Sequence, residues 1–142
     1  MRRDGEPIGL EVAATGRTLN RAFDDALGAV GGSLPVWLVL TTVKRAEHSR
    51  QRDIAGAMGL DDATLTHHLN RMERDGLVSR HRDPANRRNQ VVALTADGEA
   101  QFQRMLATVI EFDARLRRGL RAAEVDQLRT LLIRLRANVA AH

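Results

Sequence analysis

The order of patterns between residues 51 and 95 constrains the fold of this chain more than any other feature. Residues 50–58 fit a short helix closed by Gly59, a residue that suits the left-handed conformation in which helices end. A second helix begins after Asp61, whose side chain is a good N-terminal cap, and ends near Gly76. Two short helices joined so closely form a helix-turn-helix, the usual arrangement for holding a helix against DNA.

A hairpin is expected directly after this pair of helices. Residues 77–82 and 90–94 show partial alternation of apolar side chains, and residues 83–89 between them have the composition of a turn. A solvated turn is the commoner explanation of a basic loop, but beside a helix-turn-helix the arginines are well placed to enter a narrow minor groove, which attracts them. The sequence therefore predicts a winged helix-turn-helix in a mainly α fold with a small β-hairpin (α+β). The predicted DNA contacts of the wing are Asn86, Arg87 and Arg88.

The exposed face of the second helix carries the expected chemistry. If Leu65 is the centre of the inner face, Leu69 and Met72 fall beside it at roughly 100° per residue. The other faces carry hydroxyl, imidazole, amide and guanidinium groups, which suit the base edges of the major groove. A merely solvated face is the simpler explanation for an isolated helix, and the helix before it favours DNA. The predicted contacts are Ala63, Thr64, Thr66, His67, Asn70, Arg71 and Arg74.

Long helical patterns flank this segment on both sides. Aromatic residues make up only 3% of the chain, so the core must consist mainly of Leu, Val, Ala and Met. Ser33 and Thr95 are plausible caps, and Gly119 separates the last two helices. The flanking helices are predicted at about residues 9–30, 33–47, 95–118 and 122–140.

The winged segment is too small to bury the apolar stripes of the terminal helices. An intramolecular bundle would cover them, but their position outside the winged segment favours a two-fold dimer. We assign residues 1–32 and 96–142 to a helical dimerisation region and residues 33–95 to the DNA-binding region, within one intertwined domain. The predicted dimer contacts are Leu19, Leu120, Val125, Leu128, Leu132, Leu135 and Val139.

Composition and motifs exclude several classes of function. A net charge of +4 and a pI of about 11.0 favour an acidic polymer as partner. The chain has no cysteine, which excludes a disulfide scaffold and a thiolate zinc site. No phosphate loop, nucleophile elbow or His-Glu-x-x-His motif occurs. We therefore expect neither an enzyme nor a cofactor.

Nothing in the sequence predicts export or membrane insertion. Residues 1–7 are polar and precede no long apolar segment, unlike a signal peptide. The longest apolar run, residues 34–40, contains Pro35 and is far shorter than the roughly 20 residues of a membrane span. The expected location is the cytoplasm.

Four of the five histidines, His48, His67, His68 and His81, fall in the predicted DNA-binding segment. Their protonation below about pH 6.5 would add positive charge facing phosphate. Ordinary polar histidines are the simpler explanation, because no pair has the i, i+4 spacing of a helical metal site. We predict no metal site.

Five pieces of the chain occur in a specific order, although each alone is a weak signal. They are Leu34-Pro35-Val36-Trp37, Gln51-Arg52-Asp53-Ile54-Ala55 through Gly59-Leu60, Thr64-Leu65-Thr66 through Val78, Asp83-Pro84-Ala85-Asn86-Arg87-Arg88, and Ala93-Leu94-Thr95-Ala96-Asp97-Gly98. Together they resemble the MarR family of bacterial transcription regulators. The resemblance implies a homodimer with interlocking terminal helices, a winged helix-turn-helix on each subunit, a pseudo-palindromic double-stranded operator, and a repressor role. It also implies that Arg88 is the wing arginine that enters the minor groove.

The chain departs from the family pattern at several positions. Asn86 replaces the usual acidic residue of the wing, so an ion pair with the wing arginine is reduced to a hydrogen bond. His67 stands where the family often has Arg, and we expect it to read a base while His68 lies at the rim of the core. Arg121 stands where a capping Ser or Asp is usual, so the first turn of the last helix is expected to fray.

The resemblance also implies a small aromatic effector, because MarR-like proteins commonly bind one between the dimer helices and the DNA-binding lobe. The candidate ligand-binding residues are Arg17, Trp37, Thr41 and Met105. Trp37 and Met105 are also ordinary core residues. The alternative function is a small-molecule or protein-partner sensor in which DNA binding is weak or secondary.

Overall fold

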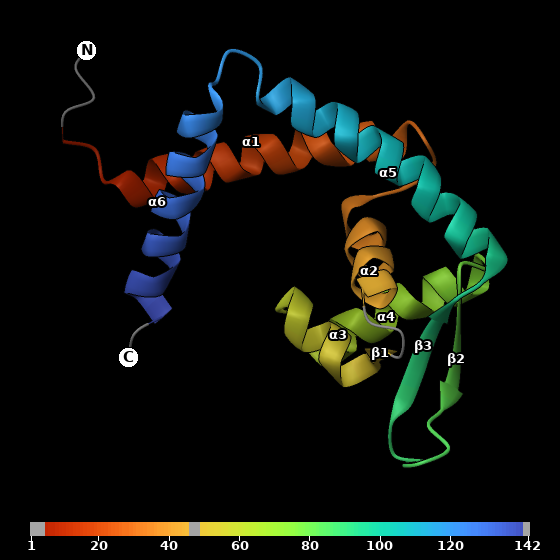
Figure 1. Cartoon of the computed structure of the whole chain (residues 1–142). Coiled ribbons are helices and arrows are strands. Elements are labelled where there is room, and N and C mark those ends of the chain that lie inside the picture. Colours follow the sequence, from red (N-terminus) through yellow and green to blue (C-terminus); the bar gives the residue numbers. More distant parts are fainter. Residues whose placement is uncertain (1–4, 46–48, 141–142) are drawn as a thin grey trace. The chain divides into compact units, whose positions relative to one another are not determined.

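The computed structural model describes residues 5–45 and 49–140, and Figure 1 shows its helices and its small sheet. The elements confirm the predicted mainly α winged helix-turn-helix with long helices at both ends. His48 and the end of the helix predicted at 33–47 lie outside the described residues. In chain order the elements are α1 (Ile8–Gly28), α2 (Leu34–Arg45), β1 (Ser49–Arg50), α3 (Gln51–Met58), α4 (Asp62–Arg74), β2 (Val78–Arg82), β3 (Gln90–Leu94), α5 (Ala96–Leu116) and α6 (Ala122–Ala140).

The predicted caps begin three of these helices. The Asp61 carboxylate accepts a hydrogen bond from the Thr64 backbone N–H at 2.7 Å, and this bond lowers the pKa of Asp61. Ser33 and Thr95 accept backbone N–H groups of α2 and α5 in the same way, at 3.3 and 3.0 Å. Each bond satisfies a donor that the first turn of a helix leaves unpaired.

The N-terminus of α6 is held without a capping side chain at Arg121. Glu124 Oε1 accepts the Arg121 backbone N–H at 2.9 Å and the Arg121 Nε–H at 3.0 Å. The backbone bond and then the side-chain bond lower the pKa of Glu124. These contacts oppose the fraying that the sequence suggested at this end.

The sheet has one more strand than the sequence predicted. Strands β2 and β3 pair antiparallel from Val78 opposite Leu94 to Arg82 opposite Gln90, which confirms the hairpin. Strand β1 pairs with the other side of β3, so the order is β1-β3-β2. Because β1 has only two residues, no alternation could reveal it. It ties the start of α3 to the wing.

The core lies between the helix-turn-helix, α2 and the sheet. Figure 1 shows α2 between α1 on one side and α3 and α4 on the other, and α2 contacts all three helices and β3. Trp37 of α2 stacks on Phe102 of α5 with ring centroids 5.4 Å apart. The largest fully buried side chains are Leu27, Val39, Leu40, Ile54, Leu65, Leu69, Met72, Val92 and Met105.

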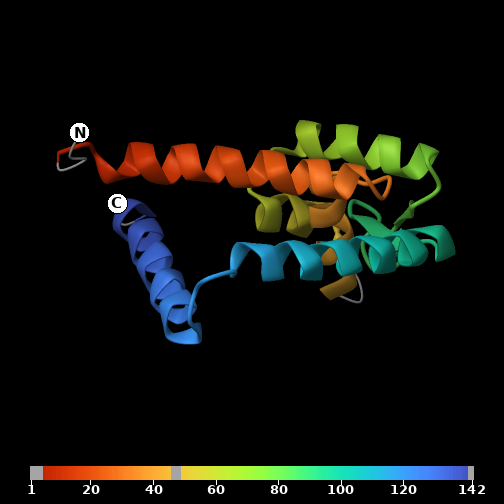
Figure 2. The same cartoon turned by 90° about the horizontal axis from the view of Figure 1, so that it is seen from above.

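The chain divides into two compact units, the first ending at Val109 and the second beginning at Ile110. The predicted division of residues 1–32 and 96–142 from 33–95 concerns roles and stays a prediction. Figure 2 shows that the N-terminal half of α1 extends beyond the rest of the first unit. In the described ranges, no helix combines the length and apolar character that crossing a bilayer requires.

Candidate nucleic-acid interface

Helix α4 presents the two faces that its sequence predicts. Leu65, Leu69 and Met72 are fully buried. The proposed base-reading residues His67 and Asn70 are exposed on the other side, as are Ala63, Thr64, Arg71 and Arg74. Burial of the apolar stripe therefore fixes which polar side chains face outward.

Thr66 lies half-buried on the flank of α4 and joins the two helices of the helix-turn-helix. The Gln51 amide Nε2 donates to Thr66 Oγ1 at 2.8 Å, from the first residue of α3. Gly59 closes α3 in the left-handed conformation, with φ of 65°. The Thr66 hydroxyl thus contributes to the packing of α3 on α4, in addition to its predicted role as a DNA contact.

Arg80 of β2 ties the wing to α4. Its guanidinium lies 3.3 Å from the Glu73 carboxylate and also donates to Asn70 Oδ1. The hydrogen bond and then the charge of Arg80 lower the pKa of Glu73. Sequence analysis did not single out Arg80, because its partners are seven and ten residues away on another element. The oxygen of Asn70 must face Arg80, since a guanidinium has no acceptor.

The wing loop is closed by its own polar side chains. Asp83 donates its backbone N–H to the Asn89 carbonyl at 2.9 Å, and Asp83 Oδ1 accepts the Ala85 N–H at 2.9 Å. Asn86 Oδ1 accepts the Arg88 backbone N–H at 3.2 Å. The hydrogen bond expected from Asn86 is therefore present, and it holds the backbone of Arg88. The side chains of Arg87 and Arg88 are exposed.

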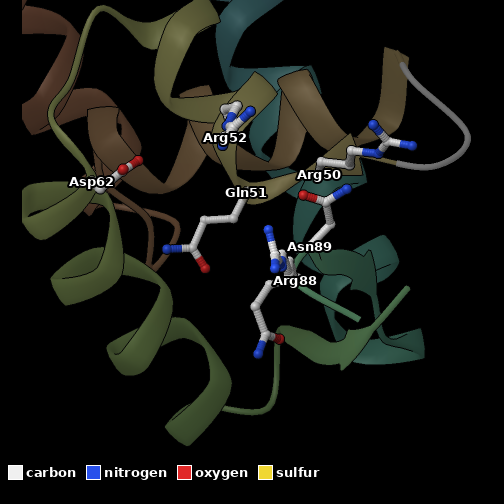
Figure 3. Close-up of a pocket in the computed structure, with 7 residues that line it drawn as sticks. Arg50, Gln51, Arg52, Asp62, Arg88 and Asn89 are labelled. Atoms are coloured by element: carbon white, nitrogen blue, oxygen red, sulfur yellow. The ribbon is translucent and has the colours of Figure 1, made fainter. Parts of the chain in front are cut away.

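A polar hollow of about 230 Å³ lies between the helix-turn-helix and the wing, and Figure 3 shows its lining. Arg50, Gln51 and Arg52 contribute from the start of α3, and Asp62 from the first turn of α4. The sequence predicted only Arg88 among its charged residues. Arg50 and Arg52 were missed because the short helix that they begin was interpreted as support for α4. The wing contributes Arg88, Asn89 and Gln90.

The histidines do not gather into a metal site. The rings of His67 and His68 lie 5.9 Å apart at 58°, with His67 exposed and His68 half-buried, as expected for a residue at the core's rim. His81 lines a separate hollow with Asp53 and Asp83. Within the described part of the chain, no group of three potential ligands is arranged to hold a metal ion.

The four candidate effector residues are not brought together in one hollow of this chain. Arg17 is exposed on α1 and lines two hollows there, neither of which Trp37, Thr41 or Met105 lines. Met105 is fully buried, packed so closely that a Cβ on Gly32 would lie 2.6 Å from its Cε. The Thr41 hydroxyl is buried without a hydrogen-bond partner among the described residues.

Most of the predicted dimer contacts are exposed in the single chain. Helix α6 has no buried residue in its described length, and Leu128 and Val139 are 49% and 73% exposed. On α1, Ile8 and Leu10 are also exposed although the sequence analysis did not name them. The other predicted contacts that are exposed are Leu19, Leu120 and Leu135, and Val125 and Leu132 are half-buried.

Comparisons with known proteins agree with this geometry. Residues 33–89 match the model of the MarR family. A MarR-family transcriptional regulator from Rhodococcus sp. RHA1 is 29% identical, with a TM-score of 0.81, and the match covers 93% of this chain and 94% of that one. CouR from Rhodococcus jostii RHA1, solved with p-coumaroyl-CoA, is 30% identical over 89% of this chain and 90% of its own, with a TM-score of 0.78. A mutant MarR from E. coli, solved with operator DNA, shares the fold at a TM-score of 0.85 and 24% identity, with 92% and 94% covered.

Proposed function

The chain belongs to the MarR family of transcriptional regulators, and from that membership we propose that it binds operator DNA as a homodimer through α4 and the wing. The contacts are those named above for the recognition helix and for Asn86, Arg87 and Arg88 of the wing. As a bacterial DNA-binding protein it acts in the cytoplasm. The family consists of regulators rather than enzymes, which supports a function without catalysis.

The observation that carries the proposal is the rigid link between two polar surfaces. α4 exposes His67, Asn70 and Arg74, and the wing exposes its two arginines. Arg80 joins these surfaces through Glu73 and Asn70. A duplex that takes α4 in its major groove meets the wing at the neighbouring minor groove, so the two elements read one site together.

The uncovered apolar side chains support the two-fold assembly. Single exposed leucines are normal, but α6 presents a row of them along its described length. A second copy of the chain would cover that row on both subunits at once, because a two-fold interface is formed by the same surface twice. Two α4 helices about one turn of DNA apart, roughly 34 Å, then read an inverted repeat.

We also propose that a small aromatic ligand regulates DNA binding. CouR was solved with p-coumaroyl-CoA, which is a precedent at 30% identity. In this chain the stacked rings of Trp37 and Phe102 and the unpartnered Thr41 hydroxyl lie on the helices beside the DNA-binding elements. A ligand that favours one arrangement of the dimer by about 1 to 3 kcal/mol would change operator affinity roughly 5- to 150-fold.

Selection of bound duplexes from a random pool tests the function. The protein as a full chain is expected to enrich an inverted repeat with half-sites about 10 base pairs apart. The rival function, a sensor in which DNA binding is secondary, predicts no enriched sequence together with binding of an aromatic ligand. Quenching of the fluorescence of Trp37, the single tryptophan, measures ligand binding in the same preparation.

A further inference from the structure

The polar hollow between the helix-turn-helix and the wing carries an unused concentration of positive charge. Three arginines line it, and Asp62 is the one carboxylate among the described lining residues. Arg50 lies 3.6 Å from Asp83 Oδ2 and is partly neutralised. The guanidinium groups of Arg52 and Arg88 have no ion-pair partner in the described ranges. The hollow therefore favours an anion.

The chemistry of the lining points to phosphate rather than to an aromatic effector. Beside the arginines, the hollow is lined by the amides of Gln51, Asn89 and Gln90, and by no aromatic or aliphatic side chain. Guanidinium and amide groups donate hydrogen bonds to phosphate oxygens, and a guanidinium can do so with two bonds at once. Its volume, about 230 Å³, is several times the roughly 30 Å³ share of one liquid water, so a hydrated phosphate group has room.

The position of the hollow identifies the source of that phosphate. It lies between the N-terminal ends of α3 and α4 and the end of the wing loop, and Figure 3 shows Arg52 and Arg88 on opposite sides of it. In B-form DNA one sugar-phosphate strand separates each major groove from the neighbouring minor groove. If α4 enters the first groove and the wing enters the second, that strand crosses the space between them.

We propose that this hollow binds a backbone phosphate of the duplex, with Arg52 as its principal donor. The inference rests on the proposed function, because it takes the placement of α4 and the wing from it. Arg52 supplies the charge-assisted hydrogen bonds, Asn89 and Gln90 add neutral donors, and Arg88 reaches past the rim toward the minor groove. Asp62 keeps the hollow from binding anions indiscriminately, since its carboxylate repels a poorly placed phosphate.

The direct test pairs one protein variant with single neutral linkages in the DNA. Each phosphate of the selected duplex is replaced in turn by an uncharged methylphosphonate, and affinity is measured at fixed salt. Wild type is expected to lose about 10-fold at one phosphate in each half-site. Arg52→Gln is expected to lose about 10-fold on the unmodified duplex and nothing further at that same phosphate.

Two further variants separate the contact from general charge. Arg118→Gln removes the same charge from the turn after α5, where Arg118 is exposed, and is expected to bind as wild type. Arg52→Lys keeps the charge without the fork, and is expected to keep the salt dependence while losing part of the affinity. Arg52→Gln should reduce the slope of log affinity against log salt by about 0.9, equally on operator and random duplexes.

The proposal is overturned if Arg52→Gln matches wild type or Arg118→Gln, or if its loss is confined to the operator. It is also overturned if inorganic phosphate stabilises wild type more than Arg52→Gln while no methylphosphonate position distinguishes them, which would mean a free-anion site only. Failure of the proposed function looks different, because wild type would then show no preference for an inverted repeat. The phosphate contact is independent of sequence and would still be measurable on random duplex.

Discussion

At the scale of single residues, the interface divides into side chains that hold the duplex and side chains that read it. Arg88 belongs to the first kind, since its side chain is exposed on the wing and its backbone is held by Asn86. Arg88→Ala is therefore expected to weaken binding to all sequences and to reduce the salt slope by about 1. Gel shifts at several salt concentrations measure both, and an unchanged slope would contradict the assignment.

His67 belongs to the second kind, because it projects from the exposed face of α4. His67→Ala is expected to relax sequence preference at one or two base positions, with a loss of about 1 to 3 kcal/mol of discrimination there. Repeating the selection with this variant checks the prediction. A consensus identical to that of wild type would show that His67 reads no base.

The Glu73–Arg80 contact gives stability a specific dependence on acid. Hydrogen bonding to Arg80 lowers the pKa of Glu73 below its usual 4.5. A carboxyl group whose folded pKa is lowered stabilises the folded state above the unfolded pKa, and that contribution is lost as pH falls through the folded pKa. Between pH 6 and values below about 4.5, wild type should lose more stability than Glu73→Gln. Thermal unfolding at each pH measures it, and parallel losses would contradict it.

At the scale of elements, the junction between the hairpin and α5 is the most closely packed point. A Cβ on Gly98 would lie 2.0 Å from the Leu77 carbonyl oxygen. Gly98→Ala must therefore move backbone, and it is expected to lower the free energy of unfolding by about 3 kcal/mol. Gly56→Ala is the control, since nothing lies within 4 Å of its Cβ and alanine favours helix. Urea unfolding of both variants measures the difference, and equal stabilities would contradict the packing.

The sequence predicted the elements well because their signals are local. The Asp61 and Thr95 caps and the left-handed Gly59 each depend on neighbours within four residues. The sequence could not predict strand β1, whose two residues pair with β3 far along the chain. For the same reason it did not predict the Arg80 link to Asn70, or the arginines at the start of α3 that share a hollow with the wing. Those contacts depend on how distant segments pack.

At the scale of the whole molecule, the account requires two copies of the chain. Leu128 is about half exposed on α6, and its neighbour Gln127 is also exposed. Leu128→Glu is expected to dissociate the dimer, because it places a charge in the apolar contact, and to abolish tight operator binding. Gln127→Glu adds the same charge beside it and should stay dimeric. Sedimentation equilibrium reports the mass of each, and a dimeric Leu128→Glu with full affinity would contradict the assignment.

The spacing of half-sites tests the central claim most directly. The selected inverted repeat is compared with one in which five base pairs, about half a turn of DNA, are inserted between the half-sites. Two α4 helices fixed on one dimer cannot reach both half-sites of the altered duplex, so the account predicts that affinity falls to that of a single half-site. Equal affinity for the two duplexes would contradict it, because the chain would then bind DNA without the paired recognition helices.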